Sequence, residues 1–192
     1  MIVTKYLSAF ATGIALAVVG VATAQNPAPA GAEKTATTPA PQPAAGDSEA
    51  LSTLSAVNKH EIAAAELAQS KTIDSATMNY ARMLQTDHTA NLKKVEEISQ
   101  MTKAPIAETP SVKELKDKTS AERDTLAKLD GTAFQTAYLD AMIKGHANVQ
   151  SMIDSKLLPG ATDVAVQQHL RNTRESVAKH LDQAKQLRGQ AK

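Results

Sequence analysis

Four apolar stripes in the sequence each contain one ionisable residue: Glu61, His88, His146 and His180. A carboxylate and three imidazoles are oxygen and nitrogen donors that suit zinc, iron, manganese or copper(II). A carboxylate buried alone is costly, so these residues need partners once the stripes are packed together. The pattern therefore predicts a site for one transition-metal ion, with Asp87 as a hydrogen-bonding residue behind the ligands.

The same four residues also fit a hydrogen-bonded core network that holds no metal. In that interpretation Glu61 accepts a hydrogen bond from a histidine, and the network fixes the register of the helices. A di-iron carboxylate centre is not expected, because it requires Glu-x-x-His on two helices. The residues three positions before the histidines are not acidic: Gln85, Ile143 and Val177.

Other candidates for chemistry are weaker. His60 adjoins Glu61 but occupies a neighbouring face of its helix, and His169 lies off the main stripe. Met142 and Met152 would suit a copper or b-type haem site, although methionine at helical spacing is more often core. The sequence has no serine nucleophile elbow, phosphate-binding glycine loop or zinc-protease motif, so catalytic turnover is not expected.

Five helices position these residues, at about 48–70, 74–103, 111–130, 132–158 and 163–189. Asp74 is a predicted N-cap, and Ser111 to Glu114 has the form of a capping box. The four long helices each carry one apolar stripe, which they bury by packing into a four-helix bundle. Short turns join the first two helices and the last two. The charged helix at 111–130 is then the crossover between two antiparallel pairs, which predicts an all-α, ferritin-like four-helix bundle with an additional crossover helix.

Composition excludes several classes of protein. The chain of 192 residues has no cysteine, which rules out disulfides, thiolate metal sites and a cysteine nucleophile. Lys and Arg number 21 against 20 for Asp and Glu, so there is no basic excess to bind a nucleic acid. Aromatic residues make up 3%, which argues against a β-sandwich and against a base-stacking surface.

The first 47 residues predict export. Residues 1–24 have one charge, Lys5, then an apolar run and Ala22-Thr23-Ala24, which together are typical of a signal peptide. Residues 25–47 are rich in Pro and Ala and are expected to form a flexible linker to a bundle domain at 48–190. The expected location is the periplasm. The alternative is an inner-membrane anchor through residues 6–24, and membrane contact is expected only if that segment is not cleaved.

Several strings of residues resemble a known family. Residues 60–68 begin with His60-Glu61, residues 80–91 contain Asp87-His88-Thr89-Ala90-Asn91, and Phe134 and Tyr138 precede His146. These strings are similar to the bacterial domain of unknown function 4142 family over about residues 48–187. The resemblance implies an exported ferritin-like bundle in which Glu61, Asp87, His88, His146 and His180 are recurring polar positions. One departure is Gln135, where the family usually has Asp.

Two functional hypotheses follow. The first is an exported bundle that binds one transition-metal ion, for metal handling or envelope stress tolerance. The alternative is a structural or interaction module of the cell envelope, with an envelope protein as partner, whose buried Glu and His residues form a core network.

Overall fold

A computed structural model describes residues 45–190, and this part of the chain contains helices and no strands. The elements are α1 (Ala45–Gln69), α2 (Ser75–Thr102), α3 (Pro110–Ala127), α4 (Gly131–Met152), a π-helical turn η1 (Ile153–Leu157), α5 (Leu158–Gly160) and α6 (Val164–Gln190). The predicted signal peptide at 1–24 and the linker up to residue 44 lie outside the described residues. The first helix begins at Ala45, three residues before the expected position.

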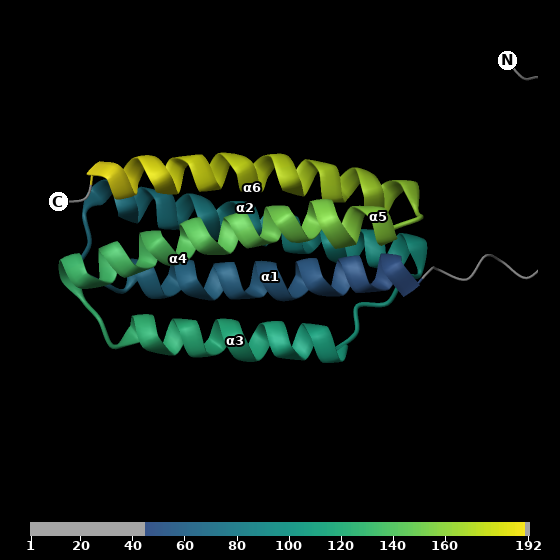
Figure 1. Cartoon of the computed structure of the whole chain (residues 1–192), viewed down its shortest axis with the longest axis horizontal. Helices are drawn as coiled ribbons and strands as arrows, with labels where there is room; N and C mark the ends of the chain where they lie inside the picture. Colours follow the sequence, from purple (N-terminus) through teal and green to yellow (C-terminus); the bar gives the residue numbers. More distant parts are fainter. Residues whose placement is uncertain (1–44, 191–192) are drawn as a thin grey trace, which may run out of the picture. The chain divides into compact units, whose positions relative to one another are not determined.

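The four long helices form a bundle of two antiparallel pairs (Figure 1). Helix α1 packs along α2, and α4 packs along α6. Helix α3 lies outside this bundle, beside α1, and carries the chain from the end of α2 to the start of α4 (Figure 1). The predicted all-α bundle with a crossover helix is therefore confirmed. No helix within residues 45–190 is long and apolar enough to span a membrane.

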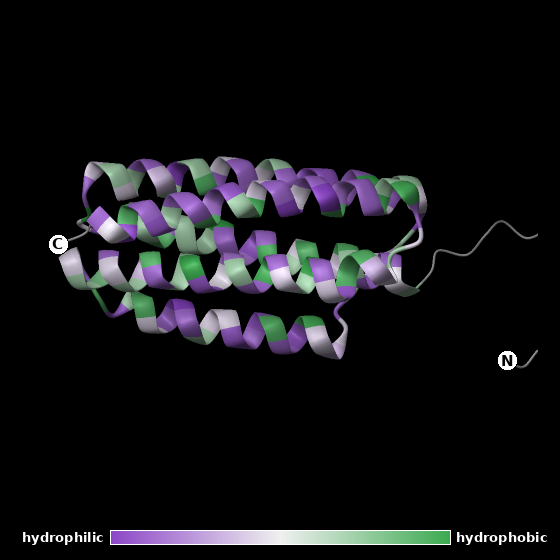
Figure 2. Ribbon diagram, turned by 45° about the horizontal axis from the view of Figure 1, so that its top comes forward, coloured by the Kyte–Doolittle hydropathy of each residue, from purple (hydrophilic) through white to green (hydrophobic). Residues whose placement is uncertain are grey.

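Burial of the apolar stripes explains the bundle. Apolar residues at three- and four-residue spacing on each long helix are buried: Leu51, Leu54, Ala65 and Ala68 in α1, Ala81, Leu84, Val95 and Ile98 in α2, Leu139, Met142 and Val149 in α4, and Val166, Leu170, Val177 and Ala184 in α6. Colouring by hydropathy shows hydrophilic residues along the outer faces of the helices (Figure 2). Each helix therefore buries one apolar face against the others, as its spacing predicts.

The core is divided into two apolar clusters. One contains Leu51, Leu54, Val95, Ile98, Val149, Ile153, Val166 and Leu170. The other contains Ala65, Tyr80, Leu84, Phe134, Tyr138, Leu139 and Ala184. In every long helix the predicted ionisable residue lies in the sequence between the members of one cluster and those of the other. The fold therefore stacks a polar layer between two apolar halves.

Helix ends agree with the sequence at some positions and not at others. Asp74 caps α2 by accepting a hydrogen bond from the Thr77 amide at 2.7 Å, as predicted. The capping box at Ser111 is wrong, because Thr109 is the N-cap of α3 and accepts from the amide of Val112. Pro110 is the first helical residue, where its fixed φ and missing N–H cost nothing.

The long helix that begins at Gly131 ends in a way that the sequence did not predict in detail. The α-helix changes to a π-helical turn at Ile153–Leu157, just before Pro159. A proline cannot donate the usual helical hydrogen bond and crowds the preceding turn, which favours an irregular turn at this point. The helical chain still stops at Pro159-Gly160, as expected.

Candidate metal centre

Three histidines from three helices meet in the polar layer. The ring centroids of His88 and His146 are 5.8 Å apart, and each lies 5.4 Å from the ring of His180. One nitrogen from each ring lies within 4.8 Å of the other two, and all three residues are buried. We call His88, His146 and His180 the histidine triad.

Two of these rings have one nitrogen held by a group that can only accept a hydrogen bond. The Nδ1 of His146 donates to the Met142 carbonyl, 2.8 Å away and one turn earlier in α4. The Nε2 of His180 donates to Oδ2 of Asp87 at 3.0 Å. The proton of each neutral ring is therefore on the nitrogen that faces its acceptor, and the lone pair is on the other.

The His88 ring is oriented by a chain of polar side chains across the bundle. Asn58 donates through Nδ2 to Oδ1 of Asn91 at 2.8 Å, and Asn91 donates to the Thr173 hydroxyl at 2.9 Å. This orientation leaves Oδ1 of Asn58 to accept from Nδ1 of His88, also at 2.8 Å. The chain links α1, α2 and α6, and it assigns the lone pair of His88 to Nε2.

The second nitrogen of each triad ring is buried without a hydrogen-bond partner within residues 45–190. These atoms are His88 Nε2, His146 Nε2 and His180 Nδ1. Three lone pairs are thus enclosed in one small region, while the opposite nitrogens are held by the protein. Neutral imidazoles oriented in this way are typical of metal-ligating histidines.

Burial keeps the triad neutral. It lowers the pKa of His88 well below its usual value, and the pKa of His146 falls to about 4 for the same reason. Burial also lowers the pKa of His180, although its hydrogen bond to Asp87 acts in the opposite direction. At neutral pH the rings are therefore in the unprotonated form that binds metal ions.

Glu61 lies beside the triad rather than within its tight group. The residue is only 3% exposed, and its Oε2 is enclosed with no hydrogen-bond partner in the described chain. Burial raises the pKa of Glu61 to about 7, and the smaller electrostatic effects of His60 and His180 act in the opposite direction. The structure therefore brings three of the four predicted ligands together and places the fourth next to them.

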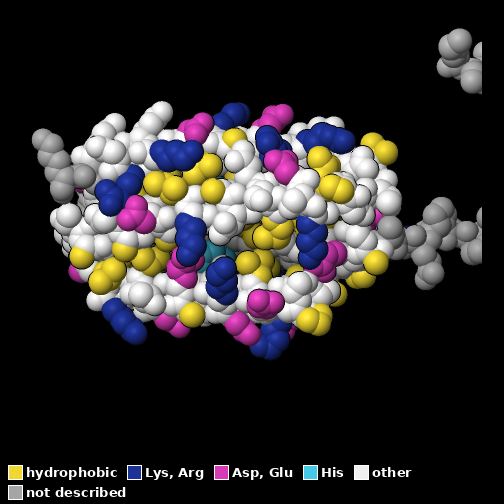
Figure 3. Space-filling model, in the orientation of Figure 1, with side chains coloured by type: hydrophobic (Ala, Val, Ile, Leu, Met, Phe, Trp, Pro, Cys, Tyr) yellow, Lys and Arg dark blue, Asp and Glu magenta, His cyan; other side chains and the backbone are white. Residues whose placement is uncertain are grey.

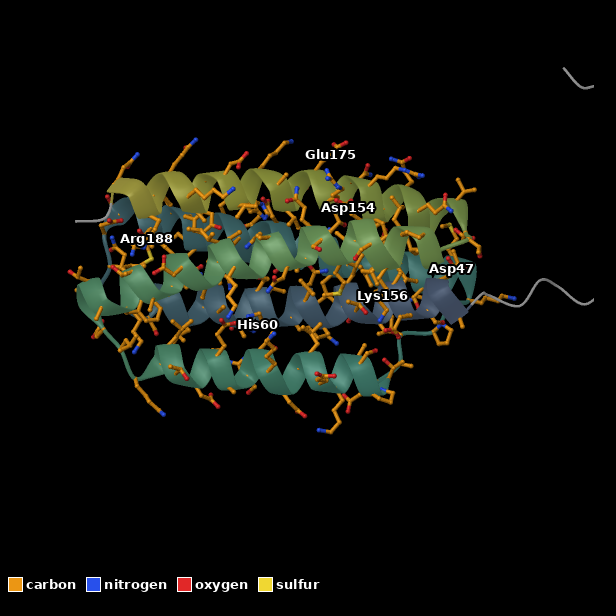
Figure 4. All side chains as sticks on the ribbon, in the orientation of Figure 1. Asp47, His60, Asp154, Lys156, Glu175 and Arg188 are labelled. Atoms are coloured by element: carbon orange, nitrogen blue, oxygen red, sulfur yellow. The ribbon has the colours of Figure 1, made fainter. Side chains whose placement is uncertain are left out.

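The remaining predicted residues have different surroundings. Asp87, with a side chain 49% exposed, accepts a hydrogen bond from His180 of α6. His60 is half-buried and lies between α1 and α3 (Figure 4). His169 is buried elsewhere on α6 and is not part of the cluster. Met142 contributes its carbonyl oxygen rather than its sulfur.

Two buried tyrosines next to the site were not predicted. The Tyr80 hydroxyl donates to the backbone carbonyl of His180 at 3.1 Å, whereas the Tyr138 hydroxyl is enclosed without a partner among the described residues. Burial, and then the nearby charge of Glu61, raise the pKa of both phenols. Each tyrosine stands eight residues before a triad histidine on its own helix. That spacing of about two turns would have been the signal.

Comparison with protein families assigns the chain. The family model described as "Domain of unknown function (DUF4142)" matches residues 32–187. The chain belongs to this family. The match includes all three triad histidines, Glu61 and Asp87, and it confirms the resemblance seen in the sequence. No match was found among curated proteins or among solved structures. Membership of the domain of unknown function 4142 family supplies no activity, so the function has to be argued from the site.

Proposed function

We propose that this protein binds one transition-metal ion through His88 Nε2, His146 Nε2 and His180 Nδ1. The observation that carries this proposal is the set of three buried, partnerless nitrogens, each on a ring whose other nitrogen already donates a hydrogen bond. Glu61 is the fourth donor in this proposal. The role we propose is metal handling or stress tolerance in the cell envelope.

A core network without a metal explains this geometry less well. A buried water molecule has two hydrogens, so it can satisfy two of the three lone pairs and leaves the third without a partner. A cation accepts all three lone pairs at once. Asn58, Asn91 and Thr173 form a hydrogen-bonded chain in this layer, and it ends at the outer nitrogen of His88.

The ligand set also fits the charge of a divalent ion. Three neutral imidazoles leave both positive charges on the metal, and the Glu61 carboxylate would neutralise one of them in a buried environment. With metal–nitrogen bonds of about 2.0–2.1 Å, tetrahedral ligand nitrogens stand roughly 3.3 Å apart. One nitrogen from each triad ring lies within 4.8 Å of the other two, so the ligand nitrogens need to approach one another by up to about 1.5 Å on binding.

The proposed setting is the periplasm, with an envelope protein as the expected partner. This part of the proposal is supported by the residues at 1–24, which have the charge, apolar run and small-residue end of a signal peptide. N-terminal sequencing of protein from a periplasmic fraction should find a chain that starts at Gln25. A chain that keeps residues 6–24 and sediments with membranes would instead support the anchored alternative.

Metal content tests the proposal. Metal-stripped protein is incubated with zinc, iron(II), manganese or copper(II), freed of unbound ions and measured by elemental analysis. About one ion per chain is expected for at least one of these metals. The His146→Gln variant should lose the bound ion, and the matched control His169→Gln, which also removes a buried histidine, should keep it. A metal content far below one per chain, or equal loss in both variants, would contradict the proposal.

A further inference from the structure

A cavity of about 340 Å³ lies beneath the middle of α3, between this helix and α1 and α4. Within α3 the buried residues are Val112 and Leu126, close to its two ends. The helix is therefore held at both ends and leaves space under its centre. The volume falls in the lower part of the range typical of small-molecule sites.

The cavity is lined by both apolar and polar side chains. Leu115, Met142, Val149 and Met152 supply apolar surface, and His60 and Glu61 supply polar groups. The view onto this face shows a hollow with histidine surface at its floor and Lys, Arg and acidic side chains around it (Figure 3). The histidine in the cavity lining is His60, which Figure 4 places between α1 and α3.

Glu61 connects the cavity to the histidine triad. It lines the cavity, yet its Oε2 is enclosed. Its Oε1 is 3.6 Å from the point that a β-carbon on Gly145 would occupy, next to His146 in the chain. A molecule that enters beneath α3 therefore meets Glu61 before it can reach a metal at the triad.

Charge indicates what kind of molecule fits. A divalent ion held by three neutral imidazoles and one carboxylate keeps a net charge of +1, which a monoanion would neutralise. Exposed Lys118 and Lys144 and half-buried Glu122 also line the cavity, giving an excess of one positive charge. Neither lysine takes part in an ion pair within the described chain. The positive charge of the metal site and the positive charge of the cavity lining both favour the approach of an anion.

We propose that the cavity beneath α3 admits a small monoanion to the metal as a fifth ligand, in addition to the three triad histidines and Glu61. The proposal rests on the metal site proposed above. It adds a ligand class and a route. The bound ion then exchanges an external ligand and is not closed off by protein donors alone.

Cobalt(II) and azide test this inference, because the visible spectrum of cobalt(II) changes with its ligands. The protein is loaded with cobalt, the cobalt content is measured, and azide is added in a stopped-flow spectrometer. A saturable spectral change is expected. Gly145→Leu, which adds a large side chain among the lining residues and next to Glu61, should slow azide binding by about tenfold or more, which corresponds to about 1.4 kcal/mol of added barrier. The matched control Ala147→Leu, on an exposed position of the same helix, should leave the rate unchanged.

A second pair of variants keeps the test independent of any folding defect at Gly145. Replacing both Lys118 and Lys144 by Gln should weaken azide binding by roughly three- to tenfold, because exposed charges act through solvent. Lys93→Gln, on α2 and away from the cavity, should have no effect. Full cobalt loading with no spectral response to azide, or equal azide kinetics in test and control variants, would overturn this inference and leave the metal site standing. A chain that takes up no cobalt, zinc, iron, manganese or copper would overturn both.

Discussion

Replacing Glu61 by Gln should stabilise the metal-free protein at alkaline pH and have almost no effect at acidic pH. Burial raises the pKa of Glu61 from 4.5 to about 7. Between these values the folded chain holds a proton that the unfolded chain has released, so the free energy of unfolding falls as pH rises through this window. The loss of stability caused by ionising buried Glu61 is absent below about pH 4.5 and reaches its full size above about pH 7.

The size of the effect follows from that pKa. At 1.36 kcal/mol per pKa unit, a rise from 4.5 to about 7 corresponds to about 3 kcal/mol. Gln resembles the protonated carboxyl group in shape and carries no charge, so the variant avoids this cost. At pH 8 its melting temperature should therefore exceed that of the wild type by roughly 6–12 °C, at 2–4 °C per kcal/mol for a chain of this size.

Urea unfolding followed by circular dichroism in the presence of a chelator, at pH 5, 6, 7 and 8, measures this difference. The control is Glu96→Gln on α2, which removes an exposed carboxylate and should give the same small difference at every pH. At pH 8 and with saturating metal, the wild type should be more stable than Glu61→Gln, since its carboxylate then faces a cation. A stability difference between Glu61→Gln and wild type that does not change with pH would refute the reasoning about this buried carboxylate.

Three further predictions concern the groups around the site and the end of the bundle. Asp87→Ala removes the acceptor that orients His180 and should weaken metal binding by about 10- to 100-fold in calorimetric titration, whereas Asp87→Asn keeps an acceptor oxygen and should lose less. Burial lowers the pKa of His146 from 6.5 to about 4, so the unfolded chain takes up a proton at a higher pH than the folded chain does. As pH falls from 7 to 4, the free energy of unfolding of the metal-free wild type should therefore decrease by about 3 kcal/mol more than that of His146→Gln. Asp47→Ala removes a buried carboxylate that accepts hydrogen bonds from the amides of Thr162 and Asp163, and it should lower the free energy of unfolding by about 1–3 kcal/mol in urea.

Most of the fold could be predicted because helical periodicity is a local property. The spacing of Leu84, His88 and Val95 places them on one face of α2 whatever lies opposite, and the same holds for the other long helices. The Asp74 cap could be predicted for the same reason. The Thr109 cap was missed because a capping box was expected at Ser111, although Pro110 favours the first helical position and Thr109 directly precedes it.

The site was predicted as a layer but not in its contacts. The positions of Glu61 and the three histidines between apolar residues on every helix indicated that they meet. The sequence did not show that Asn58 would orient His88, or that Asp87 on α2 would bind His180, 93 positions away in the chain. Nor did it show the cavity under α3, which depends on how far that helix lies from α1 and α4.

The sequence by itself determined which face of each helix is buried and which titratable residue interrupts it, since both follow from 3.6 residues per turn. Only the tertiary structure decided which nitrogen of each imidazole faces its neighbours, that three rings converge while Glu61 stays beside them, and that a cavity leads to that carboxylate. Those features depend on the rotation and axial shift of one helix against another. This rotation and shift are determined by packing among residues far apart in the chain, so they cannot be predicted from the spacing of residues within one helix.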